Sequence, residues 1–192
     1  MPESPRFPMT AVSDLPDDLR KRAEFVRSKL GFTPNVMTAL GGRSDEARAF
    51  FAYHDALMDK DDGLPKAERE MIVVATSAAN QCPYCVVAHG AMLRIRSGDP
   101  LLSDQIAANW RTAPVSERQL AMLRFAVKLA RTPEEIEEAD YQPLYREGFT
   151  DDEIWEIGAI TAFFAMSNRL AHLGHMAANP EFHMLGRLPR RR

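Results

Sequence analysis

The chain has few of the features that mark a secreted, membrane or nucleic-acid-binding protein. Only two cysteines occur among 192 residues, which excludes a small scaffold held together by disulfides. No stretch approaches the roughly 18 consecutive apolar residues of a membrane-spanning helix, so no membrane span is expected. The formal net charge is −3, which does not favour a nucleic-acid surface.

The two ends of the chain also carry no strong signal. The first residues, MPESPRFPMT, lack the charged-then-apolar pattern of a secretion signal, and we expect a cytoplasmic protein. In the cytosol, closely spaced cysteines are more often catalytic or metal-binding than structural. The last residues, RLPRRR, are basic but short, and we interpret them as a solvated tail.

The sequence instead contains apolar residues at helical spacing almost throughout. Hydrophobic residues make up 45% of the chain and charged residues 27%, a balance typical of a globular domain. We predict helices over 17–31, from a cap at Ser44, from Pro65 to Asn80, from Pro83 to Gly98, after Ser116, and after Thr150. No alternating strand pattern or clear linker occurs, and the prediction is one all-α helical bundle over 1–192.

Glu70 stands at the start of a segment that is apolar or small on every face, MIVVATSAAN. Such a helix should be buried all round, and a buried carboxylate requires a partner or a proton. The alternative is a surface glutamate in the first turns of the helix.

Both cysteines lie in the short stretch QCPYCVVAH, residues 81–89. Pro83 suits the first position of a helix, which makes Cys82 the N-cap residue, where the helix dipole favours a thiolate. Cys85 follows one turn later, and His89 lies on the same face as Cys85, within reach of its proton. Cys82, at the helix start, is expected to be the thiol that an external reductant reaches.

Three interpretations of the cysteines are open at this point. The first is a redox dithiol that closes to a disulfide on oxidation. The second is a zinc site completed by His172 and His175, although these histidines are much further along the chain than the roughly 12–15 residues of a small zinc finger. The third is a pair of inert core cysteines, which the neighbouring proline and histidine disfavour.

The spacing of the four polar residues resembles a known signature. Glu70, Cys82, Cys85 and His89 match E-x11-C-x-x-C-x-x-x-H of the alkylhydroperoxidase D family, within the carboxymuconolactone decarboxylase superfamily. The segments LPKAEREMI, CPYCVVAHGAML and GFTDDEIWEIGAITAFFAMSNRLAH are similar as well. The resemblance runs from about residue 32 to about residue 182, and the length is most similar to the subgroup of uncharacterised peroxidase-related proteins.

The resemblance implies an all-helical homo-oligomer (dimer, trimer or hexamer) that reduces organic hydroperoxides through its thiols without a cofactor. Carried over, Cys85 attacks the peroxide and Cys82 resolves the sulfenic acid. Glu70 and His89 form the proton relay that activates the thiol. A thioredoxin-like or lipoyl-bearing dithiol protein then reduces the disulfide.

One residue departs from the family pattern. Better-studied members carry a histidine directly before the second cysteine, whereas this chain has Tyr84. A phenol can donate a hydrogen bond to a peroxide and line the site, but it cannot act as a base at neutral pH. The decarboxylase branch generally lacks the CxxC, so decarboxylation on this scaffold is the lesser alternative.

A shift of 86 residues aligns the redox segment with a later part of the chain. The shift places Glu70 on Glu156, Cys82 on Asn168, Cys85 on Ala171 and His89 on His175. We predict a degenerate internal repeat, with a redox helix pair at 64–97 and a second copy at 150–178. The alternative is that two buried, small-residue helices are alike in composition only.

The remaining histidine and aromatic residues in the helices are assigned structural roles. His54 is expected at the surface or as a satisfied core residue. The pairs Phe50–Phe51 and Phe163–Phe164 are expected in the core or at a subunit contact.

Overall fold

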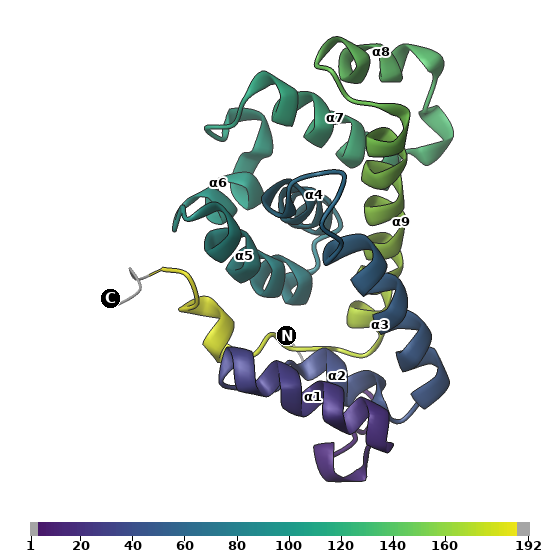
Figure 1. Ribbon diagram of the computed structural model, residues 1–192, viewed down its shortest axis with the longest axis vertical. Helices are drawn as coiled ribbons and strands as arrows, with labels where there is room; N and C mark the ends of the chain where they lie inside the picture. Colours follow the sequence, from purple (N-terminus) through teal and green to yellow (C-terminus); the bar gives the residue numbers. More distant parts are fainter. Residues whose placement is uncertain (1–3, 188–192) are drawn as a thin grey trace.

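The computed structural model describes residues 4–187, and over this range the chain is helical with no strand (Figure 1). The predicted all-α class is confirmed; the basic tail at 188–192 lies outside the described residues. The α-helices are α1 Asp17–Leu30, α2 Asn35–Gly41, α3 Ser44–Met58, α4 Lys66–Ala79, α5 Pro83–Ser97, α6 Leu102–Asn109, α7 Glu117–Arg131, α8 Glu138–Arg146 and α9 Asp151–Leu173. Short 3-10 turns occur at Val12–Asp14, Trp110–Thr112, Pro133–Glu135 and Pro180–His183.

Several of the predicted helix ends are confirmed, and a capping residue sets each of them. Gly31 ends α1 in the left-handed conformation that glycine adopts at low cost. Ser116 caps α7, and Thr150 with Glu153 forms the expected capping box of α9. The prediction for Ser44 was wrong by one position: Ser44 is the first residue of α3, and its side chain makes no capping bond.

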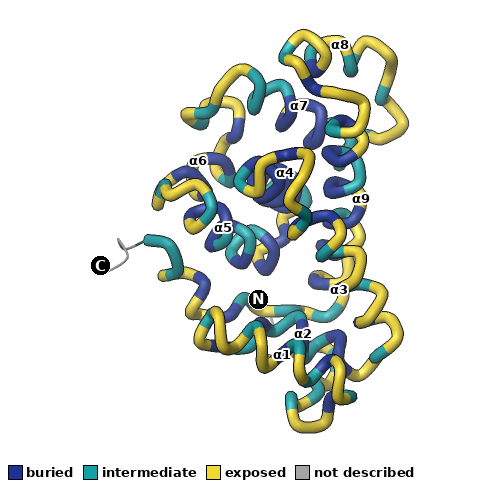
Figure 2. Tube along the Cα trace, viewed as in Figure 1, coloured by how far each residue is buried: buried dark blue, intermediate teal, exposed yellow. Residues whose placement is uncertain are grey.

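Helix α4 forms the centre of the bundle. It packs against α5, α6, α7 and α9, and its residues from Glu68 to Ser77 are buried without interruption. Figure 2 shows α4 in dark blue with the other helices around it. The prediction of a helix buried on all faces is confirmed, and it explains why the segment MIVVATSAAN has no polar face.

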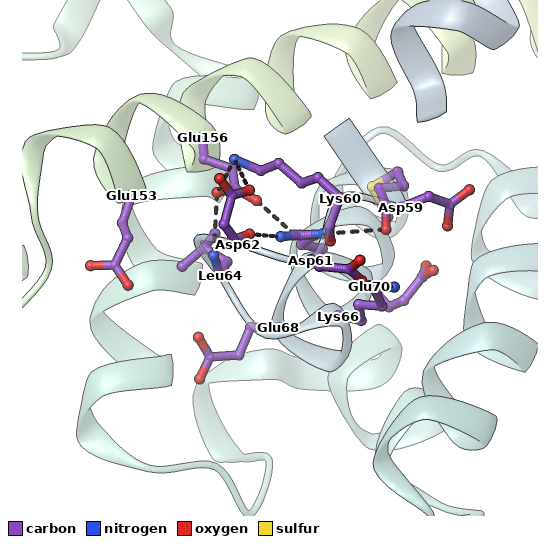
Figure 3. A network of polar contacts seen from close by, with 12 residues as sticks. Asp59, Lys60, Asp61, Asp62, Leu64, Lys66, Glu68, Glu70, Glu153 and Glu156 are labelled. Carbon is purple, nitrogen blue, oxygen red and sulfur yellow. Dashed lines mark hydrogen bonds and ion pairs between the residues drawn. The ribbon is translucent and has the colours of Figure 1, made fainter. Parts of the chain in front are cut away.

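A buried ion pair ties α4 to α9. The Arg69 guanidinium lies 2.7 Å from the Glu156 carboxylate, and both side chains are at most 3% exposed. Lys60 contacts the same carboxylate at 3.0 Å, as Figure 3 shows. Arg69 also donates to the carbonyls of Lys60 and Asp62, so the loop between α3 and α4 is fastened to this charge pair.

The N-terminal helices form a smaller core of their own beside the redox segment. Leu19, Ala23, Met37 and Phe51 are buried together there, where α1, α2 and α3 meet. In Figure 1 the C-terminal segment, drawn in yellow, runs back along α1 and α2. Asn179 fixes this arrangement, because its side chain accepts from the Asn35 amide and donates to the Thr33 carbonyl.

The two copies of the predicted repeat differ in one respect. The first copy turns from α4 into α5 at Cys82, whereas helix α9 continues without a break at the aligned position. It runs from Asp151 to Leu173, past Asn168, the position that aligns with Cys82. The internal repeat stays a prediction, and so does the single-domain assignment. Among the described residues, no helix combines the length and apolarity needed to cross a membrane.

Candidate active site

The turn between α4 and α5 places the first cysteine. The amide of Gln81 bonds to the Ala78 carbonyl, and the amide of Cys82 bonds to the Ser77 carbonyl, the pattern of a Schellman motif. Gln81 occupies the left-handed position of this motif with φ 55°, although glycine is the usual residue there. The motif ends α4 and delivers Cys82 directly to the N-cap of α5, as predicted, with Pro83 at the first helical position.

The two thiols have opposite pKa shifts. A hydrogen bond from the Cys85 thiol lowers the pKa of Cys82 to about 6, and the first-turn amide groups and nearby His172 act in the same direction. The pKa of Cys85 is raised well above its usual value by that same hydrogen bond and by burial. The reduced pair therefore holds one negative charge at neutral pH, centred on Cys82.

Both sulfurs are shielded in the chain. Cys82 and Cys85 are each 1% exposed, and neither forms a disulfide. Phe32 and Phe182 pack with the two cysteines. The expectation that Cys82 is the thiol that an external reductant reaches more easily stays a prediction. Ser167 of α9 lies beside Cys85, with 3.8 Å between Oγ and Sγ.

Glu70 and His89 meet as the spacing predicted. Glu70 Oε2 lies 2.7 Å from His89 Nδ1, and the carboxylate is 2% exposed. Arg96, two turns further along α5, contacts the other oxygen of Glu70 at 2.9 Å. An ionised Glu70 requires the proton on Nδ1, so Nε2 is the basic nitrogen of a neutral His89.

Arg96 was missed by the sequence analysis. It lies on the same face of α5 as Cys85 and His89, eleven residues after Cys85 and seven after His89, and this helical spacing is the signal that could have found it. Its charge keeps the buried Glu70 carboxylate paired from the side opposite His89.

A cavity of about 160 Å³ opens beside the second cysteine. Cys85 and His89 both line it, and most of its other walls are apolar side chains, whereas Cys82 is not among the lining residues. This cavity gives Cys85 access to a small molecule that Cys82 does not share.

His54 also lines this cavity, so its assignment as a surface or core residue was incomplete. Its ring lies 6.2 Å from the His89 ring, and Phe164 packs edge-on against His89 at 4.6 Å. Nδ1 of His54 lies 3.2 Å from Asp55, which Arg22 holds through two hydrogen bonds. No sequence motif pointed to His54, because its role depends on how α3 packs against α5 and α9.

Tyr84, the residue that departs from the family pattern, has a defined partner. Its phenol oxygen accepts a hydrogen bond from the backbone amide of Val36, at 3.1 Å. The side chain is buried, and burial raises the pKa of the phenol far above neutral pH. Tyr84 therefore stays uncharged and connects α5 to α2.

The arrangement of the histidines does not favour the zinc alternative. Within residues 4–187, the one cluster with metal-ligand spacing is His54, Asp55 and Asp59, which includes neither cysteine. Both of its carboxylates are already paired, Asp55 with Arg22 and Asp59 with Arg96. His172 is exposed and contacts the Asn80 carbonyl at 3.2 Å.

Comparisons with known proteins identify the family of this chain. The sequence profile of the carboxymuconolactone decarboxylase family matches residues 44–108, the part of the chain that contains Glu70, both cysteines, His89 and Arg96. A structure described as an alkylhydroperoxidase AhpD core, an uncharacterised peroxidase-related protein from Ralstonia eutropha, is 56% identical with a TM-score of 0.94. That match covers 97% of this chain and 98% of the other.

The chain belongs to the AhpD-like branch of the carboxymuconolactone decarboxylase family. A second AhpD-like relative, a peroxidase-related protein from Silicibacter, is 42% identical over 97% of this chain and all of its own, with a TM-score of 0.89. The debrominase Bmp8 shares the fold at 21% identity and a TM-score of 0.76, covering 94% and 95% of the two chains. A comparison with curated proteins gives no significant match.

Proposed function

We propose that this AhpD-like protein is a thiol-dependent peroxidase that reduces organic hydroperoxides through a Cys82–Cys85 dithiol cycle. The observation that supports it most strongly is the cavity at Cys85. A reactive sulfur, an imidazole held by a buried carboxylate, and an apolar chamber lie together there. This combination suits a substrate with one polar reactive group and one organic group.

The chemistry begins with the proton shared by the two thiols. Cys85 passes its proton along the hydrogen bond to the Cys82 thiolate and becomes the nucleophile. Its sulfur attacks the terminal oxygen of the hydroperoxide, the O–O bond breaks, and the departing alkoxide takes a proton that solvent supplies through Nε2 of His89, so that it leaves as an alcohol. Cys85 is now a sulfenic acid.

The second step closes the cycle on the protein. The Cys82 thiol gives up its proton, the thiolate attacks the Cys85 sulfur, and the released hydroxide combines with that proton as water. In sum, one thiol, one thiolate, one proton from solvent and one hydroperoxide give a disulfide, an alcohol and water. An external dithiol, thioredoxin-like or lipoyl-bearing, returns two electrons and two protons in the cytosol.

Mass spectrometry of the reduced protein after one equivalent of cumene hydroperoxide tests this proposal. We expect the wild type to lose two hydrogens as the disulfide forms. Cys82→Ser should instead retain a sulfenic acid on Cys85 that a dimedone probe traps, and Cys85→Ser should give neither product. Peroxide consumption by Cys85→Ser at the wild-type rate would disprove the mechanism.

The same samples separate the alternatives. A metal-binding or structural oligomer predicts about one zinc per chain with both thiols unreactive. A decarboxylase-type reaction on this scaffold predicts substrate turnover that survives replacement of both cysteines by serine.

We infer that the protein works as a homo-oligomer, and the outer face of α9 supports this. This face carries an apolar stripe, Trp155, Ala159, Ala162, Met166, Leu170 and Leu173, at the spacing of a helix-pairing seam. In the single chain Trp155 is 79% exposed and Leu173 is 61% exposed. Large apolar side chains this exposed are typical of a surface that binds another protein.

The charges at the ends of the stripe support a second copy in antiparallel orientation as the occupant. Exposed Asp152 lies near the start of α9 and exposed Arg169 lies near its end. In one antiparallel register, Asp152 lies opposite Arg169, Trp155 opposite Met166, and Ala159 opposite Ala162. The small alanines then allow close approach at the crossing, and both ion pairs form symmetrically.

A further inference from the structure

The cavity at Cys85 is walled in part by segments of the chain that the family profile does not include. Its walls include Val26 of α1, Val36 and Met37 of α2, and Phe182 of the C-terminal 3-10 turn. All four lie outside residues 44–108, the matched segment. We call the segment 26–37 the roof, because Val26, Val36 and Met37 of this segment cover the cavity opposite α5.

The roof is fixed at the start of α2 by two distant side chains. The first amide groups of a helix have no partner within the helix and must find one elsewhere. The amide of Asn35 donates to the Asn179 side chain at 2.8 Å, and the amide of Val36 donates to the Tyr84 phenol oxygen at 3.1 Å. Tyr84 thus acts as a cap for α2 from the redox helix.

The size of the cavity limits what fits beneath the roof. Its volume of about 160 Å³ is close to the roughly 150 Å³ of an apolar cavity known to take up benzene. Apolar lining residues such as Phe51, Met92 and Phe164 surround this space. A substrate group about as large as a phenyl or tert-butyl group would fill this cavity, whereas the volume of a long acyl chain exceeds it.

We propose that Tyr84 is a positioning residue that holds the roof over Cys85, and that the roof selects hydroperoxides with a compact apolar group. This inference rests on the proposed peroxidase function and names its substrate class. It also assigns a role to the position where the family carries histidine. The phenol replaces a titratable group with an uncharged anchor for the substrate-binding wall.

Single-turnover oxidation tests the selection, because it needs no reductant. We would mix the reduced protein with cumene hydroperoxide, tert-butyl hydroperoxide, hydrogen peroxide or linoleic acid hydroperoxide and follow the loss of free thiols. The wild type should react at least about tenfold faster with the two compact hydroperoxides than with hydrogen peroxide, because their apolar groups are buried on binding. The long-chain hydroperoxide should be slower than both.

Tyr84→Phe removes only the oxygen that holds the Val36 amide. The ratio of cumene hydroperoxide to hydrogen peroxide rates should fall by about fivefold, the effect expected for one lost hydrogen bond. Oxidation by hydrogen peroxide should slow less than oxidation by cumene hydroperoxide, because hydrogen peroxide has no apolar group to contact the roof. Tyr145→Phe is the matched control, since it removes a phenol that is hydrogen-bonded to Asp151 away from the cavity.

Hydrogen exchange supplies a readout that does not depend on peroxide chemistry. In Tyr84→Phe the amides of Val36 and Met37 should exchange faster, while those of α4 should be unchanged. An unchanged rate ratio together with unchanged exchange at Val36 would overturn the proposal. If no peroxide oxidises the wild type, the peroxidase function fails. Binding of 2-phenyl-2-propanol to both variants, with the exchange data, then decides the role of the roof alone.

Discussion

The charge of the reduced site is concentrated on Cys82, while the cavity gives access to Cys85. Hydrogen bonding from Cys85 and the amide groups of the first turn stabilise the Cys82 thiolate. Burial and the neighbouring negative charge oppose a second ionisation at Cys85. The arrangement stores one proton between the sulfurs until a substrate enters.

A thiolate titration of the reduced protein should therefore show two well-separated steps. Thiolate absorbance should rise with a midpoint near pH 6, as the pKa of Cys82 requires, and Cys85 should ionise only well above the usual range of a thiol pKa. Below the first midpoint both thiols are protonated, so oxidation by peroxide should slow as the pH falls through 6. Ultraviolet absorbance against pH measures both steps.

Two variants assign the steps. Cys82→Ser should lose the low midpoint. Cys85→Ala should keep one thiol but raise its pKa, because the hydrogen-bond donor that stabilises the thiolate is gone. A low midpoint that persists in Cys82→Ser would place the charge on Cys85 instead.

Sequence reasoning recovered those site residues that depend on local spacing. Cys82 at an N-cap, Cys85 one turn later and His89 one turn beyond follow from Pro83 and helix periodicity. Val36 and His54 could not be found in this way, because their contacts with the site depend on how separate helices pack. Tyr84 was noticed as a departure from a pattern, but its partner lies 48 residues away.

At the scale of helices, the clearest predictions came from caps and from α4. The capping boxes of α7 and α9 and the left-handed Gly31 are encoded within a few residues. Helices α2, α6 and α8 were not predicted, since each has at most nine residues and shows little periodicity. These short helices are stabilised by packing against neighbours that the local sequence does not reveal.

The buried pair Arg69–Glu156 holds α4 and α9 in register, so its loss should affect the whole bundle. Glu156→Ala should lower the free energy of unfolding by about 3–5 kcal/mol, because it leaves the Arg69 charge buried without its partner. Urea denaturation followed by circular dichroism measures the change. Glu24→Ala on the exposed surface of α1 should shift it by less than about 0.5 kcal/mol.

A double variant distinguishes the charge pair from simple packing. Arg69→Met with Glu156→Leu replaces both charges by apolar groups and should recover much of the loss. If Glu156→Ala is no less stable than Glu24→Ala, the pair does not hold the two helices together.

At the scale of the whole molecule, the outer face of α9 is the apolar surface that the fold leaves most open. In Figure 1, α9 lies along the edge of the bundle. Along its sequence, exposed residues alternate with buried ones. Burial inside the chain uses one face of the helix, including Ile157, Ile160 and Phe164, whereas Trp155 and Leu173 of the stripe are exposed. Association of two copies would remove Trp155 and Leu173 from water.

Charge reversal tests both the association and its antiparallel geometry. Asp152→Arg or Arg169→Asp alone should weaken self-association, because each variant places like charges opposite one another in both symmetric pairs. The double variant Asp152→Arg with Arg169→Asp should restore it, since every pair is then reversed together. Sedimentation velocity over a concentration series at low salt measures the three variants against the wild type.

Ala162→Glu provides the stronger disruption, because it introduces a carboxylate at the close approach of the two helices. This variant should sediment as a monomer while circular dichroism shows an unchanged helix content. The combination separates loss of association from loss of folding. Wild-type mass in Ala162→Glu, or a double charge variant that associates no better than either single one, would rule out this antiparallel interface and leave α9 free for a different partner.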